Sequence, residues 1–124
     1  MNIFTSGSMG TPSMLYFEGT ADEAIVPGEA LVLTSGKLTK CGATAKPQFI
    51  AQGGGTGGVI PVIRVSAEDT YKAKFTASAA SLTVGDAVTI DTNGTDITAT
   101  KTSGVATIVS LFGTAVGDCA EIRF

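Results

Sequence analysis

The chain has 124 residues, of which 44% are hydrophobic and 15% are charged, and its net charge is −3. This length fits one domain with its own core, and the absence of histidine excludes Ser-His-Asp, Cys-His and histidine-base catalysis within one chain. The Lys and Arg residues are scattered, so the sequence does not predict direct binding to nucleic acid. Its 16 Gly and many Thr, Ala and Val residues are typical of an all-β protein with tight turns.

The charge and hydropathy patterns also suggest where the protein works. No apolar run is long enough to span a bilayer, and the first residues lack the pattern of a signal peptide, so we expect neither a membrane segment nor export. A freely diffusing domain of this size usually carries more charge, so we expect copies of itself or a larger assembly to cover part of the surface. Without export, Cys41 and Cys119 are expected to be small buried thiols, with a disulfide as the alternative.

Residues 1–20 are predicted to form an extended N-terminal arm. Gly, Pro, Ser and Thr interrupt this segment, yet its large apolar side chains would be sticky if left in water. Two interpretations stay open: an irregular strand packed across its own domain, or an arm lying on a neighbouring subunit. The candidate contact residues of this segment are Ile3, Phe4, Met14, Leu15, Tyr16 and Phe17.

Residues 21–124 are predicted to form one compact β-barrel or β-sandwich of antiparallel hairpins. Residues 21–25 are expected to form a loop or a short helical turn. The predicted strands are Val26–Thr34, Leu38–Cys41, Gln48–Gln52, Val59–Val65, Tyr71–Thr76, Val84–Asp91, Asp96–Thr100, Val105–Val109 and Asp118–Phe124. In the fifth strand, Tyr71, Ala73 and Phe75 alternate with polar residues, which predicts one buried and one solvated face. Pro61 lacks an amide donor, so its strand is expected at a sheet edge or at a bulge.

The segment from Gly53 to Gly58 is the most glycine-rich part of the chain. It lacks the Lys-Ser/Thr pair and the following helix of a phosphate-binding loop. We therefore expect a long mobile loop that becomes ordered on contact with a partner. The candidate contact residues in this loop are Gly53, Gly54, Gly55, Gly57 and Gly58.

An internal hairpin repeat relates residues 26–52 to residues 84–111. In the second copy, apolar residues alternate up to the Asn93-Gly94 pair, which predicts a type I′ turn. Both copies contain a Gly-acid pair, Gly28-Glu29 and Gly85-Asp86, and Gly117-Asp118 is a third. Gly is expected to permit a turn at each pair while the acid keeps its exposed side soluble.

No pattern in the chain predicts a catalytic or metal site. The spacing of Asp91–Asp96 superficially resembles part of a calcium loop, but the later bidentate Glu of such a loop is missing, so an ordinary hairpin turn is preferred. Cys41 and Cys119 lack the CxxC spacing of zinc ligands. Glu68 and Asp69 are adjacent and are expected to be solvated. We therefore expect no catalytic residues, no metal and no cofactor.

These features together resemble a known family. The residues that carry the resemblance are the V-x-G-[DE]-A-[LV]-x-[LI] pattern at Val26–Leu33, its echo at Val84–Ile90, the Gly104-Val105-Ala106 strand start and the short C-terminal strand. With the extended N-terminal segment and the lack of histidine, they resemble the head-decoration, or cement, proteins of tailed bacteriophages. The resemblance covers roughly Val26–Phe124 and rests on generic strand and turn patterns.

The resemblance implies a structural virion protein without enzymatic activity. Such a protein is made in the host cytoplasm, binds the outside of the assembled capsid through the major capsid protein, and stabilises the shell, often as a homo-trimer. The alternatives are a component of the shell itself, or an adhesion or carbohydrate-binding β domain. The last would need exposed aromatic platforms, for which the chain offers only Tyr16 and Tyr71 and no Trp.

Overall fold

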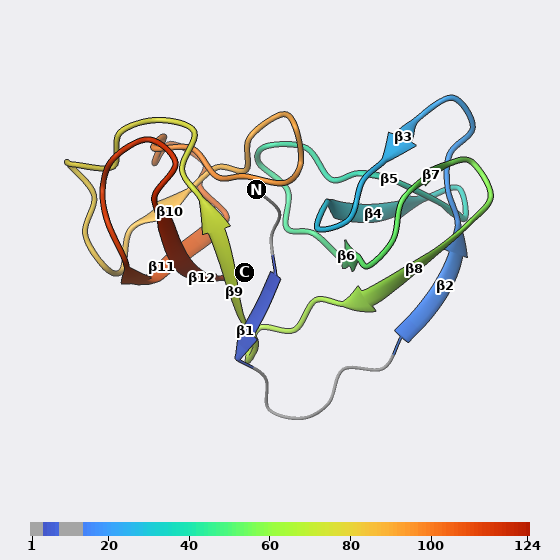
Figure 1. Ribbon diagram of the computed structural model, residues 1–124, viewed down its shortest axis with the longest axis horizontal. Coiled ribbons are helices and arrows are strands. Elements are labelled where there is room, and N and C mark those ends of the chain that lie inside the picture. Colours follow the sequence, from blue (N-terminus) through green and yellow to red (C-terminus); the bar gives the residue numbers. More distant parts are fainter. Residues whose placement is uncertain (1–3, 8–13) are drawn as a thin grey trace.

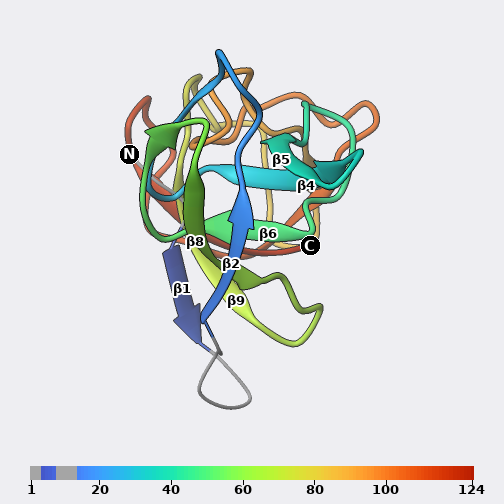
Figure 2. The same ribbon diagram turned by 90° about the vertical axis from the view of Figure 1, so that its right-hand side faces the viewer.

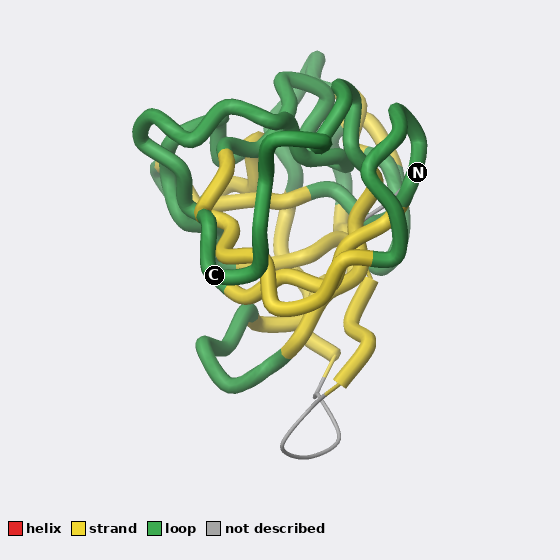
Figure 3. The backbone as a smooth tube through the Cα atoms, turned by 90° about the vertical axis from the view of Figure 1, so that its left-hand side faces the viewer, coloured by secondary structure: helices red, strands yellow, loops and turns green. Residues whose placement is uncertain are grey.

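The computed structural model describes residues 4–7 and 14–124, which form strands, turns and loops without a helix (Figure 3). The protein is therefore all-β, as its composition predicted, and its antiparallel sheets form a sandwich-like arrangement, not a closed barrel. The strands are β1 (Phe4–Gly7), β2 (Met14–Glu18), β3 (Ala24–Ile25), β4 (Ala30–Thr34), β5 (Lys37–Lys40), β6 (Phe49–Ala51), β7 (Gly55–Thr56), β8 (Val59–Arg64), β9 (Thr70–Lys74), β10 (Ala87–Val88), β11 (Ala106–Leu111) and β12 (Cys119–Arg123).

Two five-stranded sheets lie side by side in Figure 1, sheet A on the left and sheet B on the right. Sheet A has the order β1-β9-β12-β11-β10, sheet B has the order β2-β8-β6-β4-β5, and β3 pairs with β7 in a small third sheet. The larger core cluster contains buried residues of both sheets, such as Ile50, Ile63 and Ile122. A second apolar cluster, which includes Leu31 and Val62, lies on the other face of sheet B.

The predicted alternation of buried and exposed residues in β9 is confirmed. Tyr71, Ala73 and Phe75 are buried whereas Lys72 between them is exposed, because successive side chains of a strand point to opposite faces. Strand β12 lies between β9 and β11, so the C-terminal strand is an interior strand of the sheet.

The prediction that Pro61 marks an edge or a bulge is wrong. Strand β8 lies between β2 and β6, and its pairing with both strands keeps one register. The Pro61 carbonyl accepts a hydrogen bond from the Gln52 amide just beyond the end of β6. Since the nitrogen and oxygen of a strand residue face the same neighbour, the missing donor of Pro61 also points past the end of β6. There Gly53 makes room for the ring, because a Cβ on it would lie 2.9 Å from Pro61 Cγ.

The predicted type I′ turn at Asn93-Gly94 is also wrong. Gly94 has a φ of 78°, but Asn93 does not share the positive φ that a type I′ turn requires at both central residues. Instead, the Gly94 amide donates to the Asp91 carbonyl, and the Asp91 carboxylate accepts from the Asn93 amide, which closes an Asx turn. Two successive turn residues with positive φ occur instead at Ser35-Gly36, at 51° and 79°, between β4 and β5, and at Gly57-Gly58, both at 68°, between β7 and β8.

The three Gly-acid pairs Gly28-Glu29, Gly85-Asp86 and Gly117-Asp118 form the same turn. Each Gly has a φ between 83° and 99°, and each acid donates its amide to the carbonyl three residues earlier, as in a type II turn. Each Gly amide also donates to a neighbouring strand, and the acceptor residue there donates back to the carbonyl of the acid. These bonds attach the start of β4, β10 and β12 to the sheets.

The acids of these turns do more than face solvent. Asp86 Oδ2 accepts from the amide of Thr83 and Asp118 Oδ2 accepts from the amide of Ala115, each at 3.0 Å, so both carboxylates close their own turn. Glu29 makes the corresponding backbone contact at Val26, and its side chain is only 1% exposed. The predicted solvating role is therefore wrong for Glu29.

Several strands are shorter than predicted. The predicted strand Val26–Thr34 begins only at Ala30, because its first residues form the Gly28-Glu29 turn. The predicted strand Val84–Asp91 keeps only Ala87–Val88, and its principal ladder partner is β11. The contacts of this segment with residues 96–100 include a bridge between Ile90 and Ile97, a few neighbouring backbone bonds, and a hydrogen bond between the Thr89 and Thr98 hydroxyl groups at 2.7 Å.

Candidate partner-binding surface

The described part of the N-terminal segment pairs with strands of the same chain. Strand β1 pairs with β9, and β2 pairs with β8 along its whole length (Figures 1 and 2). Of the candidate residues, Ile3 lies outside the described residues, and the backbone of Phe4 is the register partner of Lys72. Residues 1–3 and 8–13 lie outside the described residues, so for them the extended arm stays a prediction.

An apolar strip lies exposed on the β2–β8 hairpin. This outer strip consists of Met14, Tyr16, Val59 and Pro61, and the first three side chains are 48%, 65% and 70% exposed. Tyr16 stands directly opposite Pro61 in the ladder, so their side chains share one face. On this face of sheet B, Ile63 packs into the larger core cluster, whereas the residues of the outer strip face solvent.

The other two candidates of β2 point away from the outer strip. Leu15 and Phe17 are half-buried against the second apolar cluster, because they alternate with Met14 and Tyr16 along the strand. The structure therefore divides the candidate residues of this strand between two faces of sheet B.

The glycine-rich segment forms defined structure within the chain. Gly55 belongs to β7, and Gly57 and Gly58 form the turn from β7 to β8. A Cβ on Gly54 would lie 2.7 Å from the Ile25 carbonyl, so its missing side chain lets β3 approach. Gly53, beside Pro61, and Gly58, which precedes Val59 in the chain, border the outer strip.

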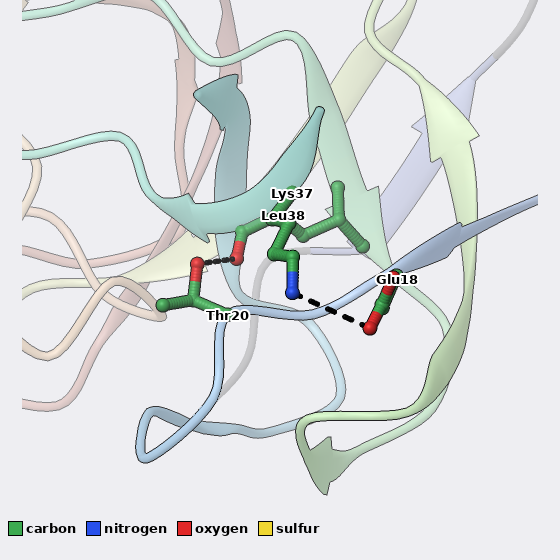
Figure 4. Close-up of polar contacts among 4 residues, drawn as sticks. All are labelled: Glu18, Thr20, Lys37 and Leu38. Carbon is green, nitrogen blue, oxygen red and sulfur yellow. Dashed lines mark hydrogen bonds and ion pairs between the residues drawn. The ribbon is translucent and has the colours of Figure 1, made fainter. Parts of the chain in front are cut away.

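Polar contacts hold the end of β2 against β5. Lys37 Nζ lies 3.4 Å from Glu18 Oε1, and Thr20 Oγ1 donates a hydrogen bond to the Leu38 carbonyl at 2.8 Å; Figure 4 draws both contacts. The ion pair is exposed and contributes little to stability, but the Thr20 bond and a bridge from Gly19 to Leu38 join the two edges of the curled sheet B. Strand β2, which carries part of the outer strip, is therefore held at its end by β8 on one side and by β5 on the other.

A groove of about 410 Å³ lies on the opposite face of sheet B. The residues that line this groove are Phe17, Leu33, Pro47, Gln48, Phe49, Arg64 and Val65. The rings of Phe17 and Phe49 are tilted with centroids 5.0 Å apart, and the Arg64 guanidinium lies 5.5 Å from the centroid of Phe49. Its volume is within the range of roughly 300–1,000 Å³ typical of small-ligand sites.

Glu29 has the most unusual environment among the described carboxylates. Burial raises its pKa from 4.5 to about 7, Glu23 adds to the increase, and Lys40 opposes it. Its Oε2 atom has no hydrogen-bond partner among the described residues. A Cβ on Gly94 would lie 2.7 Å from Glu29 Cγ, so the turn 91–94 packs directly on this side chain. Glu29 is a buried element of the fold and borders neither the outer strip nor the groove.

The side chains that resembled a calcium loop are engaged with the backbone of their own turn. Asn93 Oδ1 accepts from the amides of Thr95 and Asp96, and Asp91 Oδ2 accepts from the amide of Asn93. Within residues 4–7 and 14–124, no group of three or more His, Cys, Asp or Glu side chains could hold a metal ion. Cys41 and Cys119 are half-buried thiols, and burial raises the pKa of Cys41 to about 11.

Sequence reasoning missed several residues of these two surfaces. Val59 and Pro61 belong to the outer strip because they stand on the same face as Tyr16, which only the register of β2 with β8 reveals. Gln48, Phe49 and Arg64 meet in the groove because β6 pairs with β8. The one signal available in the sequence was Arg64 itself, a charge at the end of an apolar strand.

Comparison with known proteins gave no match to any family model or to any curated protein. The described residues include no helix with the length and hydropathy needed to cross a membrane.

Proposed function

We propose that this protein is a structural virion protein that binds the outside of an assembled phage capsid and stabilises the shell. The proposal joins the resemblance of Val26–Phe124 to head-decoration proteins with one structural observation, the exposed outer strip on the β2–β8 hairpin. Its proposed partner is the major capsid protein, and it acts without catalysis or a cofactor.

The outer strip supports this proposal because it is apolar, continuous and carried by a rigid part of the fold. Tyr16 and Val59 are 65% and 70% exposed, whereas Ile60, Val62 and Ile63 of the same hairpin are buried in two apolar clusters. Exposed apolar patches on stable sheets typically mark protein-interaction sites. Aromatic side chains such as Tyr16 are enriched in the centres of such interfaces.

A repeated shell would amplify a modest contact of this kind. Each copy needs only a small apolar patch, because oligomerisation lets several patches engage the lattice at once and raises the overall avidity. We propose a homo-oligomer, with the trimer favoured by the resemblance, on the exterior of the virion after synthesis in the host cytoplasm. A role as a component of the shell itself would use the same strip and is distinguished below.

The test is co-sedimentation of the full chain with immature and expanded capsids of the phage that encodes it, followed by electron microscopy. We expect binding to the expanded shell only, on its outer surface. Tyr16→Ser and Val59→Thr should each weaken binding about tenfold or more, because exposed apolar anchors carry much of an interface's affinity. Val84→Thr and Val116→Thr are matched controls, since these valines are 60% and 65% exposed outside the strip.

Three outcomes would contradict the proposal. If the protein is a monodisperse monomer without affinity for either shell, the proposed capsid binding is wrong. If the strip variants and the control variants lose binding equally, the outer strip is not the binding surface. Incorporation into the shell lattice during assembly would show a shell component instead. Binding to a glycan array, which we expect to be blank, would favour the carbohydrate-binding alternative through exposed Tyr16.

A further inference from the structure

The groove on the face of sheet B opposite the outer strip presents hydrogen-bond donors, but its lining side chains offer no free acceptor. Gln48 Oε1 accepts the Leu33 amide at 2.8 Å, and because an amide N–H can only donate, this bond fixes which end of the Gln48 side chain faces the backbone. The Gln48 NH₂ group is then left without a partner among the described residues. The remaining polar group is the Arg64 guanidinium, which has donors only.

The charge of Arg64 is not neutralised within the described chain. No carboxylate of the described residues lies within ion-pair distance of it, and none of the residues that line the groove is acidic. Arg64 and Phe49 are register partners on adjacent strands, so the guanidinium rests over the aromatic ring beside the groove. A bound group in the groove therefore meets a fixed positive charge on one side.

The rest of the lining is apolar and well supported. Phe49 is only 2% exposed and packs against Phe17, while Leu33, Pro47 and Val65 complete the walls. The backbone on either side of Gln48 is bonded to β4 and to Val65, at 2.8 and 2.9 Å. This combination of rigid apolar walls, one cation and unused donors is complementary to an apolar side chain with a carboxylate beside it.

We infer that the groove binds an extended acidic peptide segment of a protein partner, with an aromatic or branched apolar side chain next to an Asp or Glu. The apolar side chain occupies the space between Phe17, Leu33 and Phe49. The adjacent carboxylate accepts hydrogen bonds from Arg64 and from the Gln48 amide. This inference does not depend on shell binding, because the groove and the outer strip lie on opposite faces of sheet B.

The test is a titration of the isotopically labelled full chain, followed by its amide NMR signals, with three end-blocked tetrapeptides: Gly-Phe-Asp-Gly, Gly-Phe-Asn-Gly and Gly-Ala-Asp-Gly. We expect saturable shifts at Leu33, Gln48 and Arg64 with the Phe-Asp peptide. Replacing Asp by Asn or Phe by Ala should weaken binding about tenfold, the loss typical of one charged hydrogen bond or one buried apolar anchor.

Two variants assign the effect to the groove. Arg64→Gln should bind the Phe-Asp and Phe-Asn peptides equally, whereas Arg64→Lys should keep part of the preference through its charge. Arg123→Gln removes another exposed Arg, outside the groove, and should leave the preference intact. Any of three results would overturn the inference. They are equal affinity of the wild-type chain for the Phe-Asp and Phe-Asn peptides, NMR shifts confined to residues outside the groove, and no saturable shift with any peptide. If the wild-type chain fails to bind capsids, the proposed function is refuted, but the peptide titration still tests the groove independently.

Discussion

Replacing Glu29 with Gln should make the protein more stable above neutral pH. The Glu29 side chain is 1% exposed, its Oε2 atom lacks a hydrogen-bond partner among the described residues, and the turn at Gly94 packs on its Cγ. A charged carboxylate is costly in such a place, and a neutral amide of the same shape avoids that cost.

The size of the effect follows from the pKa of Glu29, which burial raises from 4.5 to about 7. Because the pKa is higher in the folded state, the favourable contribution is complete below pH 4.5 and is lost as the pH rises to about 7. In this window the stability contributed by Glu29 falls by about 1.4 kcal/mol per pH unit. Summed over the window, the loss is about 3 kcal/mol and stays constant at higher pH.

The assay is urea unfolding of wild type and Glu29→Gln between pH 4 and 9. The difference in unfolding free energy between the two should shift in favour of the variant by about 3 kcal/mol from the acid to the alkaline end. Glu68→Gln, at an exposed Glu, removes the same charge and reports the effect of net charge alone. A Glu29→Gln difference that does not change with pH would refute the reasoning, even if the variant were uniformly more or less stable.

Three further predictions concern glycine packing and thiol chemistry. Gly36→Ala and Gly94→Ala impose the same backbone strain, at φ of 79° and 78°, which costs about 1–2 kcal/mol. Only the second also clashes with a buried side chain, so it should cost about 1–3 kcal/mol more in urea unfolding, and equal losses would contradict this packing. Gly104→Ala should destabilise the fold by about 3 kcal/mol or prevent folding, because its Cβ would overlap a β10 carbonyl, and a variant with wild-type stability would exclude that close approach. In a Cys119→Ser background, the reaction of Cys41 with a disulfide reagent should accelerate about tenfold per pH unit until its pKa of about 11, and a plateau near pH 9 would show an unperturbed thiol.

Much of the secondary structure could be predicted from local pattern. The alternating segment Tyr71–Phe75 and the apolar run Val59–Ile63 both lie largely in strands. A strand buried on one face alternates apolar and polar residues, and a strand buried on both faces is apolar throughout, so both patterns can be recognised in the sequence. The prediction about Pro61 was wrong for a tertiary reason. Whether a missing amide donor breaks a ladder depends on where the neighbouring strand ends, and β6 ends before that donor would be needed.

The candidate surface was only partly predictable. The sequence marked Met14, Tyr16 and Phe17 as large apolar residues, but it could not separate those that face solvent from those that face the core. That separation follows from the register of β2 with β8. The groove was not predicted at all, since Arg64 and Phe49 lie far enough apart in the chain that only the pairing of β6 with β8 brings them together.

The amino-acid order by itself determined that this chain forms sheets, and it placed a Gly-acid turn before three strands, because local backbone preferences act within a few residues. The tertiary structure alone decided that Glu29 is buried while Asp86 and Asp118 are not. The three turns are locally alike, but a distant segment, the one that carries Gly94, packs directly on the Glu29 side chain, whereas Asp86 and Asp118 stay partly exposed. Burial, and with it the pKa of a carboxylate, depends on what packs from elsewhere in the chain, and no local pattern records that neighbour.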